Sequence, residues 1–136
     1  MNKQSVVRFL VLACTLFMGG CSLVQSSVPP EQRVAELAQE RLDLLISGQV
    51  ERSYAYTTPG YRSARTWQEY APNWVGATMW TSATVTKVDC GDLEPVQRCK
   101  AAVKIVFTPP RVDTMQTFVF EQWLRLDGEW YLYQKP

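Results

Sequence analysis

The sequence predicts an α+β domain in which helices come first and an antiparallel sheet of about four strands follows. Apolar residues recur with the 3.6-residue period of helices from Pro30 to about Pro72. From Trp80 to the end of the chain they alternate with the period of two that is typical of strands. Helices and strands that are segregated along the chain indicate the α+β class.

The first helix is predicted over Pro30 to Ser47. Proline suits the first turn of a helix, Glu31 suits its positive end, and Gly48 marks its end. The apolar residues of this segment share one side of the helix: Val34, Leu37, Ala38, Leu42, Leu44 and Leu45. Arg41 falls in the middle of this stripe, so it must find a partner, reach water or line a cavity.

Two shorter helices are predicted next. One covers Val50 to Tyr56 and is ended by a turn at Pro59-Gly60. The other opens at Thr66-Trp67-Gln68-Glu69, which fits a capping box, and Pro72 ends or kinks it.

Four strands follow. They are predicted at Trp80 to Cys90, Cys99 to Phe107, Met115 to Leu126 and Glu129 to Lys135. Asp127-Gly128 is a hairpin turn between the last two. In the third strand the alternation places Phe118 and Phe120 on one face and Glu121, its one acid, on the other. We therefore expect Glu121 to be the partner of Arg41.

The N-terminal residues have the parts of an export signal. A basic start with Lys3 and Arg8 precedes an apolar run from Phe9 to Met18, which is too short for a bilayer span of roughly 20 residues. Met18-Gly19-Gly20-Cys21 then resembles a bacterial lipobox, which implies that residues 1–20 are removed and that Cys21 carries lipid. The alternative is an ordinary signal peptide that is cut nearby and leaves Cys21 as a free thiol or a disulfide partner.

Lipidation of Cys21 predicts where the protein is located. Two or three acyl chains suffice for stable anchoring, and Ser22 after the cysteine resembles the default route to the outer membrane of a diderm envelope. Residues 21–30 are polar, small and proline-ended, which suits a tether that spans about 30 Å when extended. Residues 31–136 form the predicted domain. Its position is expected to be close to the periplasmic face of the membrane.

Charge and cysteine content limit the possible partners. Without Lys3 and Arg8 the mature chain has 12 basic and 13 acidic residues, so nothing favours binding to nucleic acid. Cys90 and Cys99 remain in the domain, and in an oxidising compartment such a pair predicts a disulfide. A metal site is disfavoured because the chain has no histidine.

The order of elements, with SGQVERSYAYTTPGYR after the long helix and LDGEWYLY as the closing hairpin, resembles the nuclear-transport-factor-like superfamily. The resemblance covers residues 31–136 and implies a cone-shaped fold in which a bent sheet curls around the first helix. A pocket, where this superfamily has one, lies between that helix and the concave face of the sheet. Another small helix-plus-sheet envelope domain is the alternative.

Six residues are candidates for such a pocket: Arg41, Tyr54, Trp67, Tyr70, Trp74 and Glu121. Trp67, Tyr70 and Trp74 stand at helical spacing, which indicates core packing more often than a binding surface. The structural interpretation of Arg41 is an internal ion pair. The functional alternative is that it holds an anionic ligand.

Catalysis is disfavoured, because histidine, a Gly-x-Ser-x-Gly elbow, a metal cluster and a phosphate loop are all missing, and no cofactor motif occurs. Chemistry resembling ketosteroid isomerase, using Tyr54, Glu121 and Asp89, is one alternative. The favoured hypothesis is a noncatalytic domain that docks onto another envelope protein or its own copy through the open face of the sheet. Binding of a small, lipid-like or anionic ligand in the cone is the second alternative.

Overall fold

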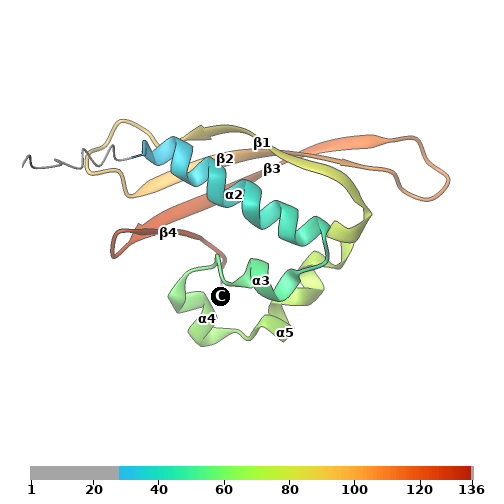
Figure 1. Cartoon of the computed structure of the whole chain (residues 1–136), viewed down its shortest axis with the longest axis horizontal. Helices are drawn as coiled ribbons and strands as arrows, with labels where there is room; N and C mark the ends of the chain where they lie inside the picture. Colours follow the sequence, from blue (N-terminus) through green and yellow to red (C-terminus); the bar gives the residue numbers. More distant parts are fainter. Residues whose placement is uncertain (1–27, 136) are drawn as a thin grey trace, which may run out of the picture.

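Helices cover one face of a four-stranded antiparallel sheet in the computed structural model, which describes residues 28–135 (Figure 1). The helical elements are α2 (Pro30–Ile46), α3 (Val50–Tyr54), α4 (Pro59–Ala64), α5 (Trp67–Tyr70) and the 3₁₀ helix η1 (Ala71–Met79). The strands are β1 (Trp80–Asp89), β2 (Arg98–Phe107), β3 (Met115–Leu126) and β4 (Glu129–Leu132), in spatial order β1-β2-β3-β4. The α+β class and the order of helices before strands are confirmed. The predicted signal peptide, residues 1–20, and Cys21 lie outside the described residues.

The long helix α2 lies over the sheet (Figure 1). Its buried apolar residues pack with residues of the strands in the core. Pro30 occupies its first turn, as predicted. Its buried residues are Val34, Ala38, Arg41, Leu42 and Leu45. Within the described residues, no helix has both the length and the apolar character needed to cross a bilayer.

The segment after α3 differs from the prediction. Pro59 and Gly60 were expected to form a turn, but they open helix α4. The Tyr61 backbone N–H donates to Oγ1 of Thr58 at 3.2 Å, so Thr58 is the N-cap and Pro59 the first helical residue. The physical reason is that threonine followed by proline satisfies a helix start as well as it satisfies a turn.

The predicted capping box at Thr66 is confirmed. The Glu69 N–H donates to Oγ1 of Thr66, and the Thr66 N–H donates to the Glu69 carboxylate at 2.8 Å. The helix ends at Tyr70 and continues as η1, so the expected α-helical stripe of Trp67, Tyr70 and Trp74 is wrong. Three residues per turn in a 3₁₀ helix change the direction of successive side chains. Trp67 is 36% exposed, whereas Tyr70 is buried.

The sheet has one complete and one incomplete pairing of β3. On one side β3 pairs with the whole of β2, from Met115 opposite Phe107 to Leu124 opposite Arg98. On the other side β4 pairs only with Trp123–Leu126. The fourth strand was expected to reach Lys135 but ends at Leu132. As a result the β2–β3 hairpin projects beyond the helical layer (Figure 1).

The core fills the space between α2 and the inner face of the sheet. Alternate residues of β2, namely Ala101, Val103 and Ile105, are buried there. Trp123 of β3 and Leu132 of β4 complete this face. The β3–β4 turn has positive φ at Asp127 (51°) and Gly128 (87°), which confirms the predicted hairpin.

The disulfide between Cys90 and Cys99 is present, with an S–S distance of 2.00 Å. Cys90 follows β1 directly and Cys99 is the second residue of β2. The bridge therefore joins the ends of two paired strands, as the sequence predicts.

Candidate functional site

A buried ion pair occupies the centre of the domain. Nη1 of Arg41 donates to Oε1 of Glu121 at 2.6 Å, and Arg41 is completely buried. Nη2 of Arg41 donates to the Tyr70 hydroxyl at 3.1 Å, and Nε1 of Trp123 donates to the second Glu121 oxygen at 3.1 Å. Both charges are thus paired and further hydrogen-bonded, which is the condition for burying them.

Aromatic rings surround this pair. The Arg41 guanidinium lies 4.3 Å from the centre of the Trp74 ring, a cation–π distance. The Tyr70 ring packs at 5.8 Å from Trp74 and at 5.5 Å from Tyr54. Among the described residues, Nε of Arg41 and Nε1 of Trp74 are buried without a hydrogen-bond partner. The ion pair and the rings therefore pack together between α2, η1 and β3.

Four of the six predicted pocket residues come together here: Arg41, Tyr70, Trp74 and Glu121. Tyr54 touches this group through its ring, while its hydroxyl donates to backbone oxygens, including that of Arg62 at 3.2 Å. Trp67 is exposed on the short helix α5. The predicted partnership of Arg41 with Glu121 is confirmed by the contact between them.

An open cleft of about 350 Å³ lies next to the buried pair. It is lined by Trp74, Trp80, Ile105, Val119, Phe120, Glu121, Gln122, Leu132, Tyr133 and Gln134. Val119 and Leu132 were not among the predicted pocket residues. The signal that could have identified Val119 is the strand alternation, which puts it on the same face as Glu121.

The cleft runs beside an unpaired edge of β3. In the described part of the chain, Met115–Glu121 has a strand partner only on the β2 side. The run Met115–Phe120 carries no charge, and all six residues are exposed. An edge of this kind presents free backbone N–H and C=O groups to another chain.

The opposite edge of the sheet is covered. Nε2 of Gln39 in α2 donates to the Ala83 carbonyl at 3.0 Å, and the Val85 N–H donates to Oε1 of Gln39 at 3.0 Å. The side-chain amide thus bonds two of the backbone groups that a neighbouring strand would pair along β1. The open part of β3 is longer, since Met115–Glu121 has a strand partner on its β2 side only.

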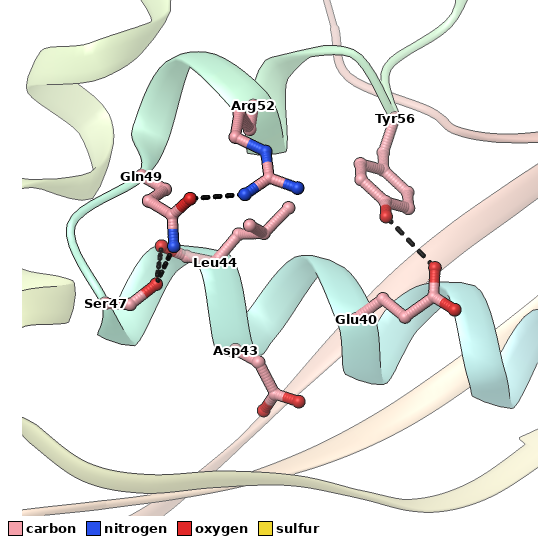
Figure 2. Close-up of a pocket in the computed structure, with 7 residues that line it drawn as sticks. All are labelled: Glu40, Asp43, Leu44, Ser47, Gln49, Arg52 and Tyr56. Atoms are coloured by element: carbon pink, nitrogen blue, oxygen red, sulfur yellow. Dashed lines mark hydrogen bonds between the residues drawn. The ribbon is translucent and has the colours of Figure 1, made fainter.

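A second hollow, of about 510 Å³, lies between α2 and α3 (Figure 2). Its lining side chains bond to one another: the Tyr56 hydroxyl donates to Glu40 at 3.0 Å, and Arg52 donates to Gln49. Burial, and then the bond to Glu40, raises the pKa of Tyr56 above its ordinary value. Because these polar groups are already paired, this hollow is the weaker candidate site.

The three residues considered for isomerase-like chemistry do not converge. Glu121 faces Arg41 inside the cone, and Tyr54 is held by backbone oxygens. Asp89 stands on β1, 64% exposed, with its carboxylate 4.0 Å from Lys87. No cluster of three or more His, Cys, Asp or Glu side chains suited to a metal ion occurs within residues 28–135.

Comparisons with known proteins show a similarity of fold and no more than that. No family model and no curated protein matches the sequence. The solution structure of a SEC-C motif containing protein from Rhodopseudomonas palustris is similar, with a TM-score of 0.55 and 14% identity over 72% of this chain and 73% of that one. A Campylobacter jejuni protein described as an NTF2-like transpeptidase gives a TM-score of 0.47 and 15% identity over 74% and 96%. At such identities no activity is carried over to this chain.

Proposed function

We propose that this protein is an envelope lipoprotein, anchored through lipid on Cys21, whose noncatalytic domain docks another polypeptide at β3. The observation that carries the proposal is the open, uncharged edge Met115–Phe120 beside an apolar cleft. The partner is an extended segment of another envelope protein or of a second copy.

Strand addition explains why the edge and the cleft lie together. A segment added along β3 would gain main-chain hydrogen bonds from the free edge. Its alternate side chains would point to one face of the sheet, where Trp74, Trp80 and Val119 line the cleft. The backbone pairing would supply affinity and the cleft would supply specificity.

The test is native mass spectrometry of the protein extracted from membranes in detergent. We expect a dimer or a complex for the wild type, and its loss for Thr117→Lys, because a lysine on an edge strand opposes pairing. Thr84→Lys on β1 is the matched control, since it adds the same charge at another exposed strand position. A monomer without any partner in all three samples contradicts docking at β3.

Ligand binding in the cleft is the second candidate. The observation that favours it is Nε1 of Trp74, a buried donor without a partner in a residue that lines the cleft. A small or lipid-like ligand with an acceptor oxygen would satisfy that donor. The same spectra would then show a retained small mass that Trp74→Phe loses, with no protein partner. An anionic ligand held by Arg41 is less favoured, because Glu121 already occupies its Nη1 group.

A further inference from the structure

The face of the sheet that points away from α2 combines lysines, an arginine and two phenylalanines. Buried residues alternate along β2, and Arg98, Lys100 and Lys104 lie between them. Directly opposite residues in paired strands share a face, so Phe118, opposite Lys104, and Phe120 lie beside these cations. We call Lys87, Arg98, Lys100, Lys104, Phe118 and Phe120 the basic outer face.

Charge differs between the outer face of the sheet and α2. The strand residues of the basic outer face have four cations, and two carboxylates share this side of the sheet: Asp89 beside the cations and Glu129 on β4. The exposed charges of α2, on the other side of the sheet, are mainly acidic: Glu31, Glu36, Glu40 and Asp43 accompany one cation, Arg33. This polarity would orient the domain on an anionic surface, with the sheet toward it and α2 away from it.

The two phenylalanines indicate which kind of anionic surface fits the basic outer face. Phe118 is 54% exposed and Phe120 is 62% exposed, and Nζ of Lys100 lies 4.3 Å from the centre of the Phe120 ring. The acidic side of a second copy would match the charge, but its exposed residues on α2 are polar and offer little to these rings. An anionic lipid bilayer supplies both requirements, since its headgroups attract cations and its interface accepts aromatic rings.

We propose that the basic outer face lies on an anionic lipid bilayer. The inference rests on the proposed function, because the lipid on Cys21 would hold the domain at that bilayer and raise its effective concentration there. The eight residues between Cys21 and α2 span about 30 Å when extended. Packed layers of a domain are about 10 Å apart, so the tether is long enough to pass the sheet.

The test uses the chain from residue 21 onward with Cys21→Ser, which has no acyl chains and keeps every element from α2 to β4. Its sedimentation is measured with vesicles of phosphatidylcholine alone and with added phosphatidylglycerol. We expect binding to the anionic vesicles only, and release at high salt, where surface charges are screened. Lys100→Gln with Lys104→Gln should lower the partition coefficient roughly 30-fold, which corresponds to about 1 kcal/mol for each lysine.

Arg33→Gln with Arg52→Gln is the matched control, because it removes the same charge from exposed residues on the helical side. It should bind like the wild type. An equal loss of vesicle binding in both double variants would show that net charge alone attracts the protein, and it would overturn the proposal. The absence of binding to anionic vesicles would also overturn it. Self-association that the lysine variant abolishes, seen by ultracentrifugation without vesicles, would assign this face to a second copy and also overturn it. Lipidation is tested by the mass of the mature protein, and docking at β3 is tested by the Thr117→Lys variant. Either part of the proposed function can therefore be contradicted independently of the vesicle experiment.

Discussion

Arg41 and Glu121 are separated by 80 residues in the chain and form a 2.6 Å ion pair between α2 and β3. Arg41 is fully buried. It donates a further hydrogen bond to the Tyr70 hydroxyl, and Trp123 donates one to Glu121. The pair thus occupies the place where the sequence resemblance implies a pocket. The cleft beside the pair and the edge of β3 remain accessible.

Breaking this pair from one side should be strongly destabilising. Arg41→Met leaves Glu121 buried without its cation, and we expect a loss of about 3–5 kcal/mol in the free energy of unfolding. Arg41→Met combined with Glu121→Gln should recover much of that loss, because glutamine keeps an acceptor for Trp123. Urea unfolding of the four proteins in the cycle measures the coupling. A coupling energy near zero would show that the two side chains do not stabilise each other.

Local patterns were sufficient to predict this pair. The position of Arg41 in the apolar stripe and the alternation in β3 are both properties of short segments, and each constrains one partner. The open edge of β3 could not be predicted in the same way, because it depends on where β4 ends. Leu132 exchanges backbone hydrogen bonds with Tyr56 and Thr58, and the last backbone bond to β3 is the one that the Tyr133 N–H donates to the Gln122 carbonyl. The contact of Leu132 joins segments far apart in the sequence, so strand alternation alone predicted a longer β4.

Among the helices, too, the features set by short segments were predicted and the others were not. The apolar stripe of α2 and the capping box at Thr66 are short-range signals, and both were interpreted correctly. Pro59-Gly60 suits a turn and a helix start equally, and α4 was missed for that reason. Trp67 is exposed although it shares α5 with the buried Tyr70, and helical spacing does not reveal which side of so short a helix faces the core.

The Cys90–Cys99 disulfide should stabilise the domain without being required for its fold. Closing a loop of about ten residues contributes roughly 2.5–3 kcal/mol in the chain-entropy estimate. Cys99→Ala should lower the melting temperature while the β1–β2 pairing is kept, which circular dichroism can follow. Intact mass should show no free thiol in the native wild type. Two thiols that alkylate freely without denaturant would contradict the bridge.

Cys21 lies outside the described residues, and its lipidation is tested in a bacterium. The wild type should partition into detergent, and its mature mass should include acyl chains, because a lipobox cysteine is modified before cleavage. Cys21→Ser should not be processed to a lipidated form. An unmodified Cys21 in the mature protein, seen by mass spectrometry, would remove the membrane anchor from the proposed function.

The capping box predicts a stability contribution that disappears in acid. The backbone N–H of Thr66, followed by its side chain, holds the pKa of Glu69 below its ordinary value. The unfolded chain therefore binds more protons than the folded one just below the ordinary glutamate pKa of about 4.3, and stability falls as the pH is lowered through that range. Glu69→Gln should melt below the wild type at neutral pH, and the difference should shrink on acidification. A difference that is independent of pH would assign the effect to something other than the charge of Glu69.

Gln39 provides a test of how the two sheet edges differ. Gln39→Ala frees the Ala83 carbonyl and the Val85 N–H on β1, and two part-buried hydrogen bonds should be lost at about 1 kcal/mol each. Gln32→Ala is the control, because it makes the same change on the same helix, where the amide bonds only the exposed Glu36. Both substitutions change helix propensity equally, so the difference between the two variants in urea unfolding measures how much Gln39 stabilises the β1 edge.

We also expect Gln39→Ala alone to increase light scattering at high concentration, since a second open edge lets sheets join on both sides. Equal stability and equal scattering of the two variants would mean that Gln39 does not protect this edge.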